Sequence, residues 1–314
     1  MIRNALLGLN RGIHPIDKYF AKTAVPGIPQ PLFIVGPPRS GTTLLYQLVA
    51  QHFNVAYMTA PLAYAHGASN LITRLLKPIL GRPKPIFTSN YGSVKGLFSP
   101  SEHAHFWYQW FPENATMGHY HSPYQLDTDS YTDLRNCLDS LAAITNRPWV
   151  FKNLYIGISA GVIARILPEA RFLFVRRDPM MVFQSLLRGR MQHDGQQWWS
   201  VKPPHYREWL NLPLWQQVTR QVFYSEAIPL RDLEHFAQNR VLEINYTDLC
   251  EDPHSSLHRI QTWLKPLGYT AYPRNSKIPQ AFHASSELRI DQPQLRLVRE
   301  EFMALNEKFY INQD

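Results

Sequence analysis

The stretch from Pro31 to Gln51, PLFIVGPPRSGTTLLYQLVAQ, has the pattern of a phosphate-binding loop. Gly36 and Gly41 bracket a tight turn between an apolar strand-like run and a run with leucines on one helical face. Such a turn points backbone N–H groups inward, and the following helix adds its partial positive end. The spacing matches the loop of nucleoside triphosphatases, except that Thr42 replaces their lysine and Arg39 is the strong cation. The loop therefore predicts binding of an anhydride other than ATP or GTP.

A second group of residues that could bind a phosphate follows another apolar run, RFLFV at residues 171–175. Arg177 comes just after this run and can direct two N–H groups of its guanidinium to one phosphate. Ser185 lies about two turns along the helix that is expected next, and it offers a hydroxyl. Arg176 is the alternative for the role of Arg177. The segment resembles the 3′-phosphate motif of the sulfotransferases, and the spacing from arginine to proline in that motif favours Arg177.

These motifs resemble those of the sulfotransferases that use 3′-phosphoadenosine 5′-phosphosulfate (PAPS), in the branch with a PRSGTT loop and an RDP motif. PPRSGTTLL is similar to the family's 5′-phosphosulfate loop, and RDP with a later serine is similar to its 3′-phosphate motif. The tetrapeptide YTDL at residues 246–249 and the dipeptide DP at residues 252–253 resemble the family's late strand-helix segment. The resemblance spans residues 31–264 and implies that a late basic loop, with Arg274 and Lys277 as candidates, closes over the 3′-phosphate. It implies further donor contacts from Pro38, Arg39, Ser40, Gly41, Thr42, Thr43, Arg177, Ser185 and Tyr246.

The order of the elements and this resemblance predict an α/β fold, a three-layer sandwich with a central, mainly parallel sheet and the topology of phosphate-loop NTPases. No low-complexity linker divides the chain, so we expect one domain over residues 1–314, with insertions that form the acceptor pocket. Residues 54–101 are not expected to form regular sheet and are interpreted as part of that pocket or as a surface crossover. We expect strands at 32–35, 147–152, 171–175 and 241–245, and helices at 70–79, 99–111, 127–146, 156–167, 180–190 and 213–238.

Lys152 ends the strand expected at 147–152, where a side chain faces the ligand crevice of an α/β sheet. In the reaction that the resemblance implies, a sulfuryl group moves in line from PAPS to an acceptor hydroxyl or amine. A cation is needed near the bridging oxygen, and Lys152 is our candidate for it. The cytosolic enzymes of the superfamily place a histidine two residues after this lysine, but here Asn153, Leu154 and Tyr155 follow. The catalytic base is therefore expected elsewhere in the chain.

The acceptor must lose a proton, so a carboxylate or an imidazole is needed within hydrogen-bond reach of it. Glu102 is our first candidate, because the helix expected from Ser99 holds the densest group of such side chains in the chain. His103 and His105 are the alternatives, and His66 is a weaker one. Glu102 also has a plain structural interpretation as a first-turn acid that offsets the helix dipole.

The chain has 314 residues and a formal charge of +8, which suggests an anionic ligand, an acidic partner surface or both. No nucleic-acid-binding signature is present, so no nucleic acid is expected as a partner. The aromatic segments 57–64, 106–111 and 198–209 suggest a large, partly apolar pocket for a small-molecule, lipid or glycan acceptor. PAPS is the expected co-substrate, and we expect no metal requirement.

Two distant cysteines, Cys137 and Cys250, and the lack of a secretory signal or of a membrane-spanning apolar run favour a cytoplasmic location with free thiols. The N-terminal twenty residues are interpreted as a helix packed on the domain or as an amphipathic helix in peripheral contact with a membrane. A homodimer is left open. Two rival functions also stay open: a small-molecule kinase with a phosphate loop, and a non-catalytic module that binds a nucleotide or a sulfated ligand.

Overall fold

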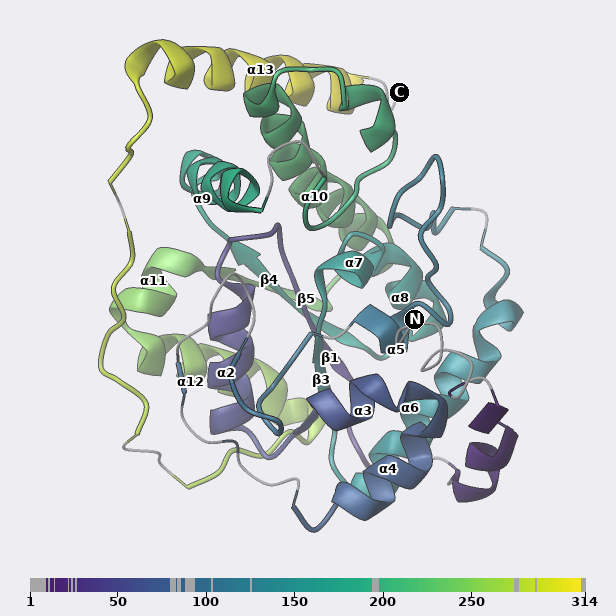
Figure 1. Cartoon of the computed structure of the whole chain (residues 1–314). Helices are drawn as coiled ribbons and strands as arrows, with labels where there is room; N and C mark the ends of the chain where they lie inside the picture. Colours follow the sequence, from purple (N-terminus) through teal and green to yellow (C-terminus); the bar gives the residue numbers. More distant parts are fainter. Residues whose placement is uncertain are drawn as a thin grey trace.

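One parallel sheet of five strands forms the centre of the described part of the chain (Figure 1). In spatial order the strands are β2 (Ala56–Tyr57), β3 (Trp149–Lys152), β1 (Leu32–Val35), β4 (Arg171–Arg176) and β5 (Val241–Asn245). Leu32 of β1 is level with Val150 of β3 and with Arg171 of β4. This sheet confirms the predicted α/β fold. The structure, a computed structural model, describes residues 10, 12–13, 15–21, 23, 25, 27–79, 83, 86–87, 94–102, 104–124, 126–193, 198–273, 277–285 and 287–311.

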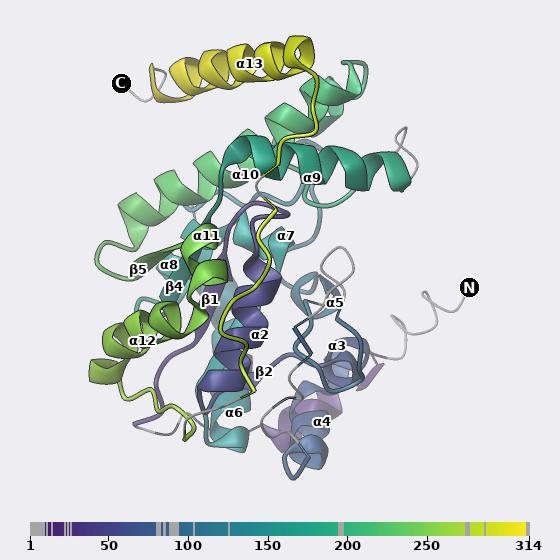
Figure 2. The same ribbon diagram turned by 90° about the vertical axis from the view of Figure 1, so that its left-hand side faces the viewer.

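Helices cover both faces of the sheet, because neighbouring residues of a strand point to opposite sides. Phe33 of β1 packs on one face with Phe151 and Phe172, at ring-centroid distances of 5.4 and 5.8 Å. The helices on this face are α6 (Thr132–Thr145), α8 (Ala160–Ile166) and α10 (Leu214–Phe236). Leu32 and Ile34 point to the other face, toward α2 (Thr42–His52) and α12 (Pro253–Leu264), the layer that faces the viewer in Figure 2. Burial from both sides explains why β1 is apolar along its whole length.

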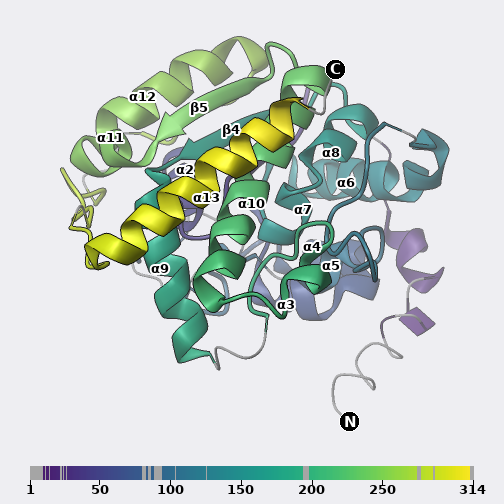
Figure 3. The same cartoon turned by 90° about the horizontal axis from the view of Figure 1, so that it is seen from above.

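A further group of helices packs at the carboxyl end of the strands. The chain passes from β4 into α9 (Pro179–Gln192) after two residues, and α9 packs on α10 and on α13 (Gln292–Ile311) through apolar side chains such as Phe183, Val222 and Val298. Figure 3 shows α13 lying across α10. The remaining helices are α3 (Ala60–Tyr64), α4 (Ser69–Leu76), α5 (Ala104–Trp107), α7 (Leu154–Gly157) and α11 (Tyr246–Glu251), with 3-10 turns at Lys18–Phe20, His66–Ala68, Thr128–Tyr131, Tyr206–Trp209 and Lys265–Leu267.

The expectation that residues 54–101 form no regular sheet is wrong. Ala56 and Tyr57 form β2, which pairs with Trp149 and Val150 at the edge of the sheet, and the backbone N–H of Ala56 donates to the carbonyl of Pro148 at 2.8 Å. Two residues are too few to show the alternation by which a strand is recognised. The pairing is set by the position of β3 rather than by a local pattern.

The helix expected at 99–111 is confined to α5, because contacts with other segments hold the residues before it. The backbone N–H of Ser101 donates to the carbonyl of Met58 at 3.0 Å, and the Nδ2 of Asn153 donates to the carbonyl of Glu102 at 2.9 Å. Glu102 therefore precedes the helix rather than lying in its first turn.

The helix expected at 156–167 is divided into α7 and α8 at Ser159. The hydroxyl of Ser159 accepts from the backbone N–H of His121 at 2.8 Å and donates to the carbonyl of His119 at 3.0 Å. These bonds tie the break between the two helices to a loop some 40 positions earlier, so tertiary contacts interrupt a continuous helical pattern.

The described part of the N-terminal segment packs on α4. Asp17 accepts hydrogen bonds from the backbone N–H groups of Asn70 and Leu71 at 3.0 and 2.9 Å. Among the residues that the structure describes, no helix has the length and apolar character needed to span a membrane. Cys137 and Cys250 are both free thiols, as predicted.

Candidate active site

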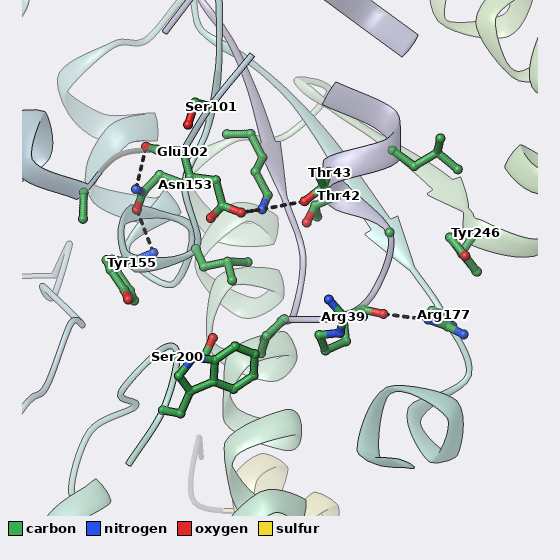
Figure 4. Close-up of a pocket in the computed structure, with 17 residues that line it drawn as sticks. Arg39, Thr42, Thr43, Ser101, Glu102, Asn153, Tyr155, Arg177, Ser200 and Tyr246 are labelled. Carbon is green, nitrogen blue, oxygen red and sulfur yellow. Dashed lines mark hydrogen bonds and ion pairs between the residues drawn. The ribbon is translucent and has the colours of Figure 1, made fainter. Parts of the chain in front are cut away.

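A cleft of about 450 Å³ opens where β1, β3 and β4 end (Figure 4). We call its two sides the loop end and the aromatic end, and Lys152 lies between them. The loop end consists of Pro38, Arg39, Gly41, Thr42, Thr43, Leu44, Arg177 and Tyr246. The aromatic end consists of Ser101, Glu102, Ala104, Asn153, Leu154, Tyr155, Trp199 and Ser200. The cleft thus brings together most of the site residues predicted from sequence, which come from segments up to about 200 positions apart.

Gly41, in the loop between β1 and α2, has no room for a side chain. Gly41 has a φ of 101°, and a Cβ atom there would lie 2.1 Å from a ring carbon of Tyr246. Any side chain would therefore displace this tyrosine and strain the turn. Arg39 also has a positive φ, of 70°, a strained conformation that is concentrated at functional sites.

The first turn of α2 is suited to an anion. The helix begins at Thr42 with no side-chain cap and no acidic residue in its first turn. Its first backbone N–H groups lack helical acceptors, and the helix dipole places partial positive charge beside them. The hydroxyls of Thr42 and Thr43 lie at the same place (Figure 4). This turn can hold a phosphate or sulfate group without a lysine in the loop.

Arg39, Arg177 and Ser185 connect the loop to the tip of β4. The Nε of Arg39 donates to the hydroxyl of Ser185 at 3.0 Å, and the Nη1 of Arg177 donates to the carbonyl of Arg39 at 2.8 Å. The guanidinium of Arg177 also lies 4.3 Å from the ring centroid of Tyr246. Ser185 itself is not part of the cleft lining, but it reaches the cleft through Arg39. The two predicted phosphate sites are therefore in direct contact.

The RDP tripeptide has a structural explanation. The carboxylate of Asp178 accepts from the backbone N–H groups of Met180 and Met181 at 2.8 and 3.0 Å and so caps α9, and Pro179 is its first residue. The cap fixes the direction of α9 and with it the position of Ser185. Arg176, the alternative to Arg177, contacts Glu226 and Glu243 at 3.4 and 3.7 Å and does not line the cleft.

Lys152 and Glu102 form an ion pair at the centre of the cleft. Lys152 is 3% exposed, and its Nζ donates to the carboxylate of Glu102 and, at 3.2 Å, to the hydroxyl of Thr43. Burial lowers the pKa of Lys152 from its ordinary value, and the neighbouring Glu102 carboxylate opposes that change. A buried cation and a partly exposed carboxylate are thus joined by one hydrogen bond. Such a pair can stabilise developing negative charge and accept a proton side by side.

Asn153 fixes this ion pair and was not predicted as a site residue. Its Oδ1 accepts from the backbone N–H groups of Tyr155 and Ile156 at 2.8 and 3.2 Å, which caps α7. Its Nδ2 donates a hydrogen bond to the carbonyl of Glu102. An asparagine between a strand and a helix indicates a cap. The second contact joins positions 51 apart in sequence, so no local pattern could have revealed it.

The other predicted residues that the structure describes lie away from the cleft lining. The ring of His105 stacks on that of His66 with centroids 6.4 Å apart, and neither side chain lines the cleft. Ser40 is buried within the loop, and Lys277 is exposed outside the cleft. His103 and Arg274 lie outside the described residues. Glu102 is thus the one predicted base that the described residues place beside Lys152.

The aromatic end has fixed walls. The ring of Tyr155 stacks on His119 and Tyr108, with centroid distances of 4.1 and 6.0 Å. The backbone N–H of Lys202 donates to the Nδ1 of His119 at 2.9 Å, and the N–H of His119 donates to the carbonyl of Lys202 at 2.8 Å. The loop that carries Trp199 is thereby tied to the loop behind Tyr155.

The aromatic segments 57–64 and 106–111 do not contribute to the cleft lining, contrary to expectation. Phe106, Trp107 and Phe111 belong to the core on the α6 face of the sheet, and Tyr57 belongs to the core on the α2 face. Of the three segments, only 198–209 supplies lining residues. In the described part of the chain, no three His, Cys, Asp or Glu side chains are arranged to hold a metal ion.

Comparison with known proteins identifies a family. The model of the sulfotransferase family matches residues 31–266. Sulfotransferase STF9 from Mycobacterium avium is similar in structure, with a TM-score of 0.56 and 15% sequence identity over 90% of this chain and 77% of that chain. Sulfotransferase STF1 from Mycobacterium tuberculosis H37Rv gives a TM-score of 0.54 and 15% identity over 95% of this chain and 81% of that chain. Comparison with curated protein sequences gives no match.

Proposed function

This chain belongs to the sulfotransferase family, and we propose that it moves a sulfuryl group from PAPS to a hydroxyl or amine of a small-molecule, lipid or glycan acceptor. The observation that carries the proposal is the ion pair of Lys152 and Glu102, placed between the loop end and the aromatic end of one cleft. A donor and an acceptor bound at the two ends would meet at this pair.

The loop end provides the groups that a phosphosulfate donor requires. The first turn of α2, with the hydroxyls of Thr42 and Thr43, would hold the 5′-phosphosulfate. Arg177 and Ser185 would hold the 3′-phosphate, because both form hydrogen bonds with Arg39 of the same loop. Tyr246 packs against Arg177 and would limit the position of the nucleotide. Arg39 contacts both sites and would couple them.

In the transfer step, the acceptor oxygen forms a bond to sulfur while the bond from sulfur to the bridging oxygen breaks. The leaving group is adenosine 3′,5′-bisphosphate. Lys152 would stabilise the charge that develops on the bridging oxygen, from a preorganised and buried position. Glu102 would take the proton of the acceptor hydroxyl. No other protein group needs to supply or remove an electron pair.

The decisive experiment measures transfer of labelled sulfate from PAPS to a panel of hydroxylated acceptors, together with binding of adenosine 3′,5′-bisphosphate. Glu102→Gln should lower kcat by about 10²–10⁴-fold, the usual contribution of a general base, and leave bisphosphate binding nearly unchanged. Glu243→Gln is the matched control, because Glu243 is an exposed carboxylate outside the cleft.

Two results would contradict the proposal. A thermal shift with Mg-ATP and none with the bisphosphate would favour a kinase. Bisphosphate binding without turnover of any acceptor in the parent protein would favour a non-catalytic module.

A further inference from the structure

The charges of the cleft are divided unequally between its two ends. Arg39 and Arg177 lie at the loop end, where a donor with several negative charges would use them. Lys152 lies in the middle and already contacts the Glu102 carboxylate and the Thr43 hydroxyl. The cations of the described lining thus all belong to the donor side or to the point of transfer.

The aromatic end carries a single formal charge among its described residues, the carboxylate of Glu102. Its other polar groups are neutral: the hydroxyls of Ser101 and Ser200 and the amide of Asn153. Leu154 and Ala104 add apolar surface. Burial, and then the carboxylates of Glu102 and Glu113, raise the pKa of the Tyr155 phenol, so this hydroxyl stays neutral and can donate a hydrogen bond.

One wall of the aromatic end is held by hydrogen bonds, and the cation beside it, Lys202, is paired outside the cleft. The carbonyls of Trp199 and Val201 accept hydrogen bonds from the side-chain amide Nε2 of Gln221, at 2.8 and 2.7 Å. Lys202 follows directly, and its Nζ lies 2.8 and 2.7 Å from the two carboxylate oxygens of Glu113. Its charge is therefore compensated outside the cleft, and it does not line the aromatic end.

We propose that the acceptor is an uncharged alcohol, with an apolar or ring-shaped body that contacts Tyr155 and Trp199 and a hydroxyl that reaches Glu102. The proposal rests on the sulfotransferase function proposed above and specifies its acceptor. A carboxylate, sulfate or phosphate on the acceptor would lie near the Glu102 carboxylate in a partly desolvated site, and the described residues of the aromatic end supply no cation to pair with it. Acidic glycans and acidic peptides are therefore excluded as preferred acceptors.

The test compares acceptors that present the same hydroxyl with and without a negative charge. Suitable pairs are 4-methylbenzyl alcohol with 4-(hydroxymethyl)benzoate, octyl β-D-glucoside with octyl β-D-glucuronide, and 1-octanol with 8-hydroxyoctanoate. For the pairs that react, kcat/KM should favour the neutral member by on the order of 100-fold, the effect of like charges at close range in a partly buried site. Equal rates, a preference for the anionic members, or no turnover of any neutral member while adenosine 3′,5′-bisphosphate binds would overturn the proposal.

A variant pair tests the charge argument directly. Ala104→Lys adds a cation to the aromatic end, and Ala104→Met adds similar bulk without charge. The lysine variant should raise kcat/KM for the anionic acceptors by about 10-fold relative to the methionine variant. Equal values for the two variants would overturn the proposal. Adenosine 3′,5′-bisphosphate binding monitors folding of both, and its absence in the parent protein would instead refute the proposed function on which this inference rests.

Discussion

The two ends of the cleft are built from different kinds of contact. At the loop end, the strands lead through short turns into helix starts that are capped or suited to an anion, as in the turn before α2 and the Asp178 cap of α9. At the aromatic end, three short segments around Glu102, Tyr155 and Trp199 are held by bonds from distant positions. Under the proposed function, donor recognition would therefore depend on local motifs, whereas acceptor recognition would depend on tertiary packing.

This difference has a consequence for variation between related proteins. The loop end tolerates little change, since a Cβ at position 41 would clash with Tyr246 and the carbonyl of Arg39 accepts a hydrogen bond from Arg177. The aromatic end can change one wall residue at a time while Asn153 and Lys152 keep Glu102 in place. We infer that acceptor preference can change without loss of the donor site.

The largest expected effect concerns pH and the wall behind Tyr155. The Nδ1 of His119 accepts the N–H of Lys202, and a protonated ring could not accept this bond. Burial lowers the pKa of His119 from 6.5 to about 4, against the opposing effect of Glu113, while Lys202 and His121 lower it further. The unfolded chain therefore binds this proton at higher pH than the folded chain. The contribution of His119 to the free energy of unfolding should be fully present above pH 6.5. It should be lost as the pH falls toward 4, and the loss should be on the order of 3 kcal/mol.

Urea denaturation between pH 7.5 and 4 measures this loss. His119→Asn keeps an oxygen that can accept from Lys202 and removes the titration, so its unfolding free energy should depend less on pH. His258→Asn, on the exposed side of α12, is the control. If His119→Asn retained the full pH dependence, the loss would arise elsewhere and the wall would not depend on a neutral imidazole.

The next effect concerns the loop end and separates two adjacent arginines. Arg177→Ala should weaken binding of adenosine 3′,5′-bisphosphate by about 10–100-fold, the range for lost hydrogen bonds to a charged group. Arg176→Ala should change it little, because Arg176 contacts Glu226 and Glu243 instead of lining the cleft. Calorimetric titration with the bisphosphate and with 5′-AMP provides the measurement. The preference for the bisphosphate over AMP should shrink in Arg177→Ala alone, and the reverse pattern would assign the 3′-phosphate to Arg176.

Sequence reasoning predicted the two ends unequally, for the same physical reason. Strands β1, β4 and β5 followed from apolar runs within short windows, and the motif residues at the loop end followed from turn chemistry and from short motifs that resemble those of the sulfotransferases. The aromatic segments could not be assigned, because Phe106 and Trp107 in the core and Trp199 in the cleft are equally apolar in sequence. The contact of Asn153 with Glu102 depends on where β3 ends relative to a loop 51 positions earlier. A single sequence carries no signal for such a distance.

The smallest expected effect tests whether Asn153 is a positioning residue. Asn153→Ser retains an oxygen that can cap α7 but loses the amide that holds the Glu102 carbonyl. We expect kcat to fall about 10-fold, as a misplaced base would cause, while the KM for PAPS and the Kd for the bisphosphate change little.

Asn153→Ala removes the cap as well and should cost about 1 kcal/mol of additional stability. A purely structural role would make both variants lose activity only in proportion to their loss of folded protein. A fall in kcat for the well-folded serine variant, at unchanged donor affinity, would therefore show that Asn153 positions Glu102. Equal kcat values in Asn153→Ser and the parent protein would show that it does not.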